Sequence, residues 1–139
     1  MDWERVPTKL GKTYGVTVAW RKPSNRAQPM LNISVSKKLS QQIGVKKEKG
    51  AEVQRVIVER NRMRGLVRVK LAEEDADRRE SRAIAWKAGG FTVSFPMEDM
   101  TAQDPIPAED VIWEHKDEWL VIKLPHWACP MIHVSGKVA

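Results

Sequence analysis

Apolar and polar residues alternate along several short stretches of the chain, and this period of two is typical of β-strands with one buried face. In the first half the alternation covers residues 13–20 and 31–36. Two further β-rich stretches, 53–59 and 66–71, are separated by a polar segment that ends in Gly65. This arrangement predicts a β-hairpin with its turn at 60–65.

One segment of the first half has the spacing of a helix instead. Leu39 and Ile43 are four residues apart, so they share one helical face. Ser36 precedes them and suits an N-cap, and Gly44 follows them and suits the left-handed residue that ends a helix. We therefore expect a short helix over 36–44.

The second half repeats this order of elements. Strands are expected at 82–86 and 91–95, a hairpin at 111–114 and 118–124, and an edge strand at 131–134. Residues 97–107 stand where the first half has its helix, but Pro105 and Pro107 disfavour one, so a loop is expected there. Residues 72–81 carry no large apolar side chain and predict an exposed linker.

The similarity of the two halves extends to individual residues. Ala19-Trp20 precedes the first matching strand and Ala85-Trp86 precedes the second, and residues 31–36 align with 91–96. Units of this size bury too little apolar surface to be stable alone, so two copies are expected to pair about a pseudo-twofold axis. The prediction is one α+β domain, mostly β, over residues 1–139. Its two strand–helix–hairpin units are a first unit at 13–71 and a second unit at 82–134.

Composition narrows the class of protein. The chain has 139 residues, of which 42% are hydrophobic, enough for one core. It has no apolar run near the roughly 20 residues of a membrane span, and its first residues lack the apolar stretch of a signal peptide. The single cysteine, Cys129, forms no internal disulfide. We expect a cytoplasmic protein that does not contact membranes.

Charge is distributed unevenly between the halves. The net charge is +6, but residues 1–70 carry seventeen Lys or Arg and five Asp or Glu, whereas residues 71–139 carry seven and thirteen. A basic surface of this size attracts polyanions, most often nucleic acid. The alternative is that the two halves neutralise each other, within one chain or between two chains. The opposite charges also favour a homodimer.

The order of strand, short helix ending in Ile43-Gly44-Val45, polar link and hairpin resembles the AbrB-type swapped-hairpin family, which includes the SpoVT and MraZ proteins. Pro96 stands where that family has a proline, while Ser36 replaces it in the first unit. The match covers most of residues 31–71 and, more loosely, 91–124. The resemblance implies a swapped-hairpin-like β-barrel and a DNA-binding regulator of the repressor or antitoxin kind.

In that family, basic residues flank the first strand and the start of the helix. The resemblance therefore implies contacts to duplex DNA from Arg21, Lys22, Arg26, Lys37 and Lys38. Lys37 and Lys38 also oppose the dipole of the expected helix, which favours a visiting anion.

A second group of cations is indicated by charge crowding alone. Arg60, Arg62 and Arg64 crowd the expected hairpin turn with no acid beyond Glu59, and their mutual repulsion would be relieved by phosphate. The alternative is a solvated turn that faces the acidic second unit.

Two other functions remain open. The basic half could dock an acidic protein partner, for example as an inhibitor of a host enzyme or polymerase. Single-stranded nucleic acid is the third candidate, because the chain has six tryptophans. Four of them lie in expected strands and are predicted to pack in the core: Trp20, Trp86, Trp113 and Trp119.

Enzymatic chemistry has little support in the sequence. His126, Cys129 and His133 have a spacing that zinc ligands use, but a fourth ligand is missing, so no metal site is expected. Cys129 lacks an acidic orienter and a glycine-rich oxyanion loop. The sequence also lacks a glycine-rich phosphate loop. We expect no cofactor and no catalytic residue.

Overall fold

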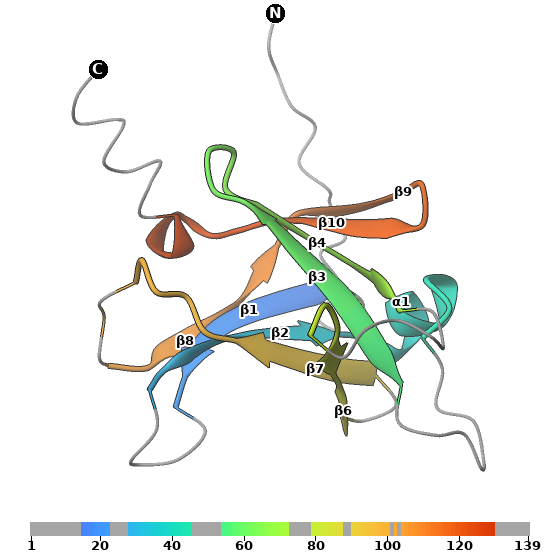
Figure 1. Ribbon diagram of the computed structural model, residues 1–139, viewed down its shortest axis with the longest axis horizontal. Helices are drawn as coiled ribbons and strands as arrows, with labels where there is room; N and C mark the ends of the chain where they lie inside the picture. The colour runs from blue at the N-terminus through green and yellow to red at the C-terminus, as the bar shows by residue number, and fades with distance from the viewer. Residues whose placement is uncertain are drawn as a thin grey trace, which may run out of the picture.

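The computed structural model describes residues 15–22, 28–45, 54–72, 79–87, 90–100, 102 and 104–129. Their strands form two antiparallel five-stranded sheets rather than one closed barrel, with one short α-helix (Figure 1). The mostly-β prediction is therefore confirmed. The predicted edge strand at 131–134 lies outside the described residues, as does most of the linker at 72–81. Among the described residues, no helix has the length and apolar character needed to cross a bilayer.

The first sheet, sheet A, contains the strands expected at the start of each unit. Its strands, in spatial order, are β6 (Ala85–Lys87), β7 (Gly90–Phe95), β2 (Met30–Val35), β1 (Val16–Arg21) and β8 (Ile106–Val111). The central ladder joins the halves of the chain, because β2 pairs with β7 and places Ile33 opposite Val93.

The second sheet, sheet B, contains the two hairpins. Its strands, in spatial order, are β5 (Arg82–Ala83), β3 (Arg55–Asn61), β4 (Leu66–Leu71), β10 (Trp119–Lys123) and β9 (Trp113–Lys116). Here too the central ladder joins the halves, because β4 pairs with β10 and places Arg68 opposite Val121.

The chain passes from one sheet to the other at both edges. A single residue, Ile84, separates β5 of sheet B from β6 of sheet A, and Ile112 separates β8 of sheet A from β9 of sheet B. The apolar faces of the two sheets enclose the core, which includes Trp20, Leu31, Ile33, Phe91, Val67, Val69, Leu120 and Ile122. Burial of these side chains is the main source of stability.

The helix α1 (Lys37–Gln42) confirms the predicted caps. The Ser36 hydroxyl accepts a hydrogen bond from the Leu39 amide at 3.3 Å, and Gly44 has a φ of 89°. Leu39 and Ile43 are buried against the core, as their spacing predicted. A short 3-10 helix at His126–Ala128 lies on the opposite side of the molecule, drawn in red in Figure 1.

One strand was not predicted. The described residues between 96 and 105 contain no helix, as the prolines indicated, but β8 begins at Ile106 and includes Pro107. The strand lies at the edge of sheet A, where a missing N–H is tolerated. The second hairpin turn is also one residue shorter than predicted, because only Asp117 and Glu118 separate β9 from β10. Both adopt positive φ values, 51° and 71°, as expected for a two-residue hairpin turn.

Gly90 provides a test of the packing between α1 and β7. A Cβ atom at Gly90 would lie 2.0 Å from the Val35 carbonyl oxygen and 2.9 Å from the Lys37 amide nitrogen. We expect Gly90→Ala to lower the free energy of unfolding by about 3 kcal/mol or more, because backbone atoms must move to admit the methyl group. Urea denaturation measures this change.

Gly44→Ala is the matched control for this substitution. Among the described residues, no atom other than those of its chain neighbours lies within 4 Å of a Cβ at Gly44, so the positive φ is what opposes alanine there, at a cost of about 1 kcal/mol. If the two variants lost the same free energy of unfolding, the inferred close contact between Gly90 and the backbone of Val35 and Lys37 would be contradicted.

Candidate nucleic-acid interface

The structure places the predicted cations in three separate groups. Arg21 ends β1 and Lys22 follows it, and both are exposed. Lys37 and Lys38 form the exposed first turn of α1, which contains no acidic residue. The third group is at the β3–β4 turn, and Arg26 lies outside the described residues.

The first two groups lie at opposite ends of β2. Arg21 pairs with Met30 at the start of this strand, whereas Lys37 follows its last residue by two positions. Six residues of extended chain span about 20 Å. The β3–β4 turn belongs to the other sheet and projects at the upper left of Figure 1, away from α1 on the right. The predicted cations within the described residues therefore do not form a single patch.

The β3–β4 turn is held in place by its own hydrogen bonds. The Asn61 side-chain oxygen accepts from the Arg64 amide at 3.1 Å, and Gly65 adopts a φ of 66°. The Gly65 carbonyl accepts from the Leu124 amide at 2.9 Å, which ties the turn to the end of β10. This anchoring fixes the direction in which the turn projects.

The outermost residues of this turn combine charge with apolar surface. Arg62 and Arg64 are exposed and have no carboxylate partner among the described residues. Between them, Met63 is 70% exposed. We call residues 62–64 the basic tip. The sequence indicated the charges of this tip. The apolar residue between two arginines could also have been noticed in the sequence, because turns usually carry polar side chains.

Arg60, in contrast, is occupied by an internal ion pair. Its two terminal nitrogens each donate a hydrogen bond to an Asp99 carboxylate oxygen at 2.7 Å, and the side chains are 15% and 20% exposed. The hydrogen bond from Arg60 lowers the pKa of Asp99, against the opposing effect of burial. Arg60 therefore joins the hairpin to the second unit, which is the alternative that the sequence left open for these arginines.

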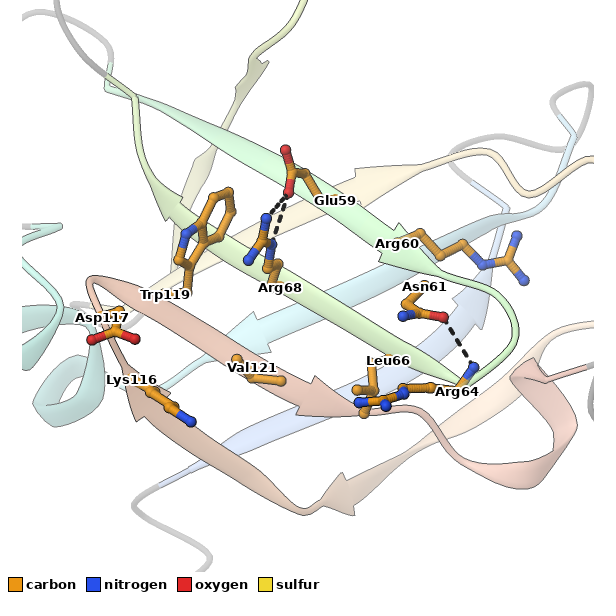
Figure 2. A pocket seen from close by; sticks show the side chains of 10 residues that line it. All are labelled: Glu59, Arg60, Asn61, Arg64, Leu66, Arg68, Lys116, Asp117, Trp119 and Val121. Atoms are coloured by element: carbon orange, nitrogen blue, oxygen red, sulfur yellow. Dashed lines mark hydrogen bonds and ion pairs between the residues drawn. The ribbon is translucent and has the colours of Figure 1, made fainter.

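The outer face of sheet B carries a groove of about 670 Å³ next to the basic tip (Figure 2). Arg68 crosses this face and donates to the Glu59 carboxylate at 2.7 Å from Nε. Its guanidinium carbon also lies 4.0 Å from the centroid of the Trp119 ring, and the Lys70 ammonium lies 4.7 Å from the same centroid. These contacts form a cation–π cluster across β3, β4 and β10.

The prediction that Trp119 packs in the core is wrong. Leu120 and Ile122 of β10 are fully buried, so the alternation of the strand turns Trp119 to the outer face. Of the other three tryptophans, Trp20 is buried, and Trp86 and Trp113 pack partly buried against the core. The Trp20 indole also donates to the Ala102 carbonyl at 2.9 Å.

Trp119 is poorly placed to stack on an unpaired base. The Arg68 guanidinium and the Lys70 ammonium already lie over this ring, within 5 Å of its centroid. A base that stacked on the ring at either place would have to displace a cation, which disfavours single-strand binding at this groove.

Cys129 has the environment of an inert thiol. It is buried, its Sγ atom lies 3.2 Å from the Pro125 carbonyl oxygen, and desolvation raises the pKa of the thiol. No group of three or more metal-ligating side chains occurs within the described part of the chain. His133, the third residue of the weak zinc spacing, lies outside that part.

The Arg60–Asp99 pair generates a prediction about pH. Because the pKa of Asp99 is lowered in the folded state, its ion pair contributes stability at neutral pH that is lost as the pH falls below about 4. Asp99→Asn should lower the free energy of unfolding by about 2 kcal/mol at pH 7, because the partly buried Arg60 loses its partner.

Urea denaturation between pH 7 and pH 3 measures both effects. The difference between Asp99→Asn and the unsubstituted protein should shrink at the acid end of the series. Asp104→Asn is the control, because Asp104 is exposed and forms no ion pair with any described residue. A constant difference at all pH values would show that the pair does not titrate as inferred.

Comparison with known proteins assigns neither a family nor a function to this chain. The chain matches no protein-family model, no curated protein and no solved structure. The resemblance to the AbrB-type family therefore stays a prediction from the residues that carry it. The function must be argued from the surface of the molecule itself.

Proposed function

We propose that the protein binds duplex DNA through its basic first unit and acts as a small transcriptional regulator of the repressor or antitoxin kind. The observation that carries this proposal is the basic tip. Two exposed arginines, which have no carboxylate partner in the described part of the chain, flank an exposed methionine at the end of an anchored β-hairpin. This combination of exposed charge and exposed apolar surface is better satisfied in a DNA groove than in water.

Each part of the basic tip matches a feature of duplex DNA. Arginine side chains bind phosphates and enter narrow minor grooves, where the negative potential is strongest. Apolar side chains such as Met insert between base steps in proteins that bend DNA from the minor groove. Met63 stands between Arg62 and Arg64, so a wedge and its flanking charges reach the groove together.

The remaining exposed cations extend the contact surface. Arg21, Lys22 and Lys37 are exposed and form no ion pair with any described residue. Their charges therefore remain available for phosphates, whose neutralisation releases counterions and adds affinity. Their separation from the basic tip favours an extended polyanion over a compact anionic ligand.

The pairing registers support the duplication that the sequence predicts. Trp20 pairs with Leu31 in sheet A, and Trp86 pairs with Phe91. The predicted equivalence of these residues thus extends to their hydrogen-bonded partners. In the ladder between β2 and β7, Leu31 faces Phe95, which is the arrangement expected about a twofold axis beside Ile33.

Sheet B supports the same axis. Arg60 pairs with Val67 in the first hairpin, and His115 pairs with Leu120 in the second. In the ladder between β4 and β10, Arg68 pairs with Val121, and these two residues occupy matching places in the two hairpins. We infer a pseudo-twofold arrangement of two units, as in a swapped-hairpin dimer fused into one chain.

The second unit carries acids where the first has several of its cations, although Lys87 follows Trp86 as Arg21 follows Trp20. Where the first hairpin has the basic tip, the second has a turn of Asp117 and Glu118. Lys38, eight residues after Met30, corresponds to Glu98, eight residues after Gly90. Within the pseudo-twofold arrangement, DNA contacts are therefore expected mainly from the first unit. This asymmetry agrees with the charge difference between the two halves of the sequence.

The proposal predicts a salt-dependent affinity for duplex DNA. The affinity should fall steeply as salt rises, because each phosphate contact releases counterions. Replacing Arg62 and Arg64 together by Gln should reduce the logarithmic salt slope by about two units. Replacing Lys37 and Lys38 together by Gln should reduce the salt slope by a similar amount. Fluorescence anisotropy with a labelled duplex over a salt series measures the slope.

Lys123→Gln serves as the control for these substitutions, because it removes an exposed cation from the second unit. Its salt slope should stay within experimental error of the unsubstituted protein. Single-stranded DNA and RNA of the same length form separate arms. Equal affinity for single strands would favour the single-strand alternative, and no binding to any nucleic acid would leave an acidic protein as the partner.

A further inference from the structure

A second pocket, of about 400 Å³, lies on the other side of the β3–β4 hairpin from the Trp119 groove. Four arginines line it: Arg60, Arg62, Arg79 and Arg82. They come from β3, the basic tip, the turn before β5, and β5 itself. Val58 and Phe95 add apolar surface to the wall of the pocket.

The four guanidinium groups are not equally available. Arg60 is committed to Asp99 through both terminal nitrogens. Arg82 donates only from Nε, to the Ser94 carbonyl at 2.8 Å. This bond fixes the side chain and leaves its terminal nitrogens without an acceptor among the described residues. Arg62 has no ion-pair partner there either.

The acidic residues of this pocket do not neutralise it. Apart from the Arg60–Asp99 pair, the lining holds three arginines and two carboxylates, Glu80 and Glu98. Both glutamates, Arg62 and Arg79 are exposed, so water screens charges of both signs, and the balance of the lining stays positive. The excess positive charge also reaches Asp99, whose pKa is lowered by the charge of Arg62 as well as by Arg60.

We propose that this pocket binds a phosphate group, held by the guanidinium groups of Arg62, Arg79 and Arg82. Guanidinium groups match the oxygens of a phosphate with paired hydrogen bonds, and three of them around one pocket exceed what a solvated surface needs. The apolar wall at Val58 and Phe95 gives room for the sugar or base that carries the phosphate. The ligand chemistry is that of a nucleotide phosphate ester.

Two sources can supply such a group. The pocket shares Arg62 with the basic tip, so a backbone phosphate of bound DNA can occupy it; in that case the inference rests on the proposed function. A free mononucleotide can occupy it independently of DNA. The experiment must therefore separate the two sources.

Isothermal titration calorimetry of the full chain with inorganic phosphate and with adenosine monophosphate, at constant ionic strength, tests the pocket directly. We expect a dissociation constant for inorganic phosphate of about 1 mM, weakened about tenfold in Arg79→Gln. Arg82→Lys should weaken it as well, because lysine keeps the charge but loses the fork of donors. Arg79 is exposed, so the first variant tests the pocket without disturbing a strand.

Arg64→Gln is the matched control, because Arg64 lies on the same hairpin but lines the Trp119 groove. It should leave the phosphate titration unchanged while weakening duplex binding. Phosphate binding that is undetectable at 20 times the expected constant, or that weakens equally in Arg64→Gln and Arg79→Gln, would overturn the pocket as a site.

The same variants distinguish the two sources. Adenosine monophosphate that binds about tenfold more tightly than inorganic phosphate identifies a free nucleotide as the ligand. Equal affinities, together with a duplex salt slope reduced by about one unit in Arg79→Gln, identify a backbone phosphate. If the protein binds the duplex but not phosphate, the pocket is not a phosphate site and the proposed function stands. If it binds phosphate but not the duplex, the pocket is a phosphate site and the proposed function is wrong.

Discussion

Two antiparallel ladders, β2 with β7 and β4 with β10, hold the halves of this chain together. Each lies at the centre of its sheet, and the other strands attach around it. Their inner faces supply fully buried residues on both sides of the core, among them Ile33 and Val93 in one layer and Val67 and Leu120 in the other. Because these ladders join residues far apart in the sequence, closing them costs more chain entropy than closing a hairpin, which is typical of slowly folding β-proteins. Neither half has a complete sheet without the other.

The alternation of apolar residues was sufficient to predict the strands that have one buried face. It failed at β8, where only Val111 is buried and no alternation exists. The strand forms because sheet A has a free edge beside β1, and that edge accepts Pro107. Tertiary context decided this element, as it often does for strands.

The sequence predicted which charged residues the candidate site contains, but not which residues those charges contact. Arg60, Arg62 and Arg64 look alike in sequence, yet among the described residues only Arg60 meets a carboxylate, and that carboxylate is 39 residues away. The side of Trp119 could have been predicted, because Leu120 and Ile122 set the inward positions of β10. The arginine pocket could not, because Arg79 belongs to a segment that reads as a solvated linker. Bringing distant residues together is a property of the fold rather than of any local pattern.

The passage of the chain between sheets at Ile84 and Ile112 has a consequence for aggregation. Exposed sheet edges are templates on which strands of other molecules can add. Here each edge strand of one sheet continues directly into an edge strand of the other, so the edges are short: β5 has two residues, β6 three and β9 four. The six-residue edge strand β8 carries Pro107 and two exposed acids, Glu109 and Asp110, which oppose the addition of another strand. β5 pairs only with Arg55 and Val56 of the seven-residue strand β3, so residues 57–61 have no ladder partner on that side among the described strands. On this part of the hairpin the charged side chains of Glu59 and Arg60, rather than a covering strand, discourage pairing with another molecule.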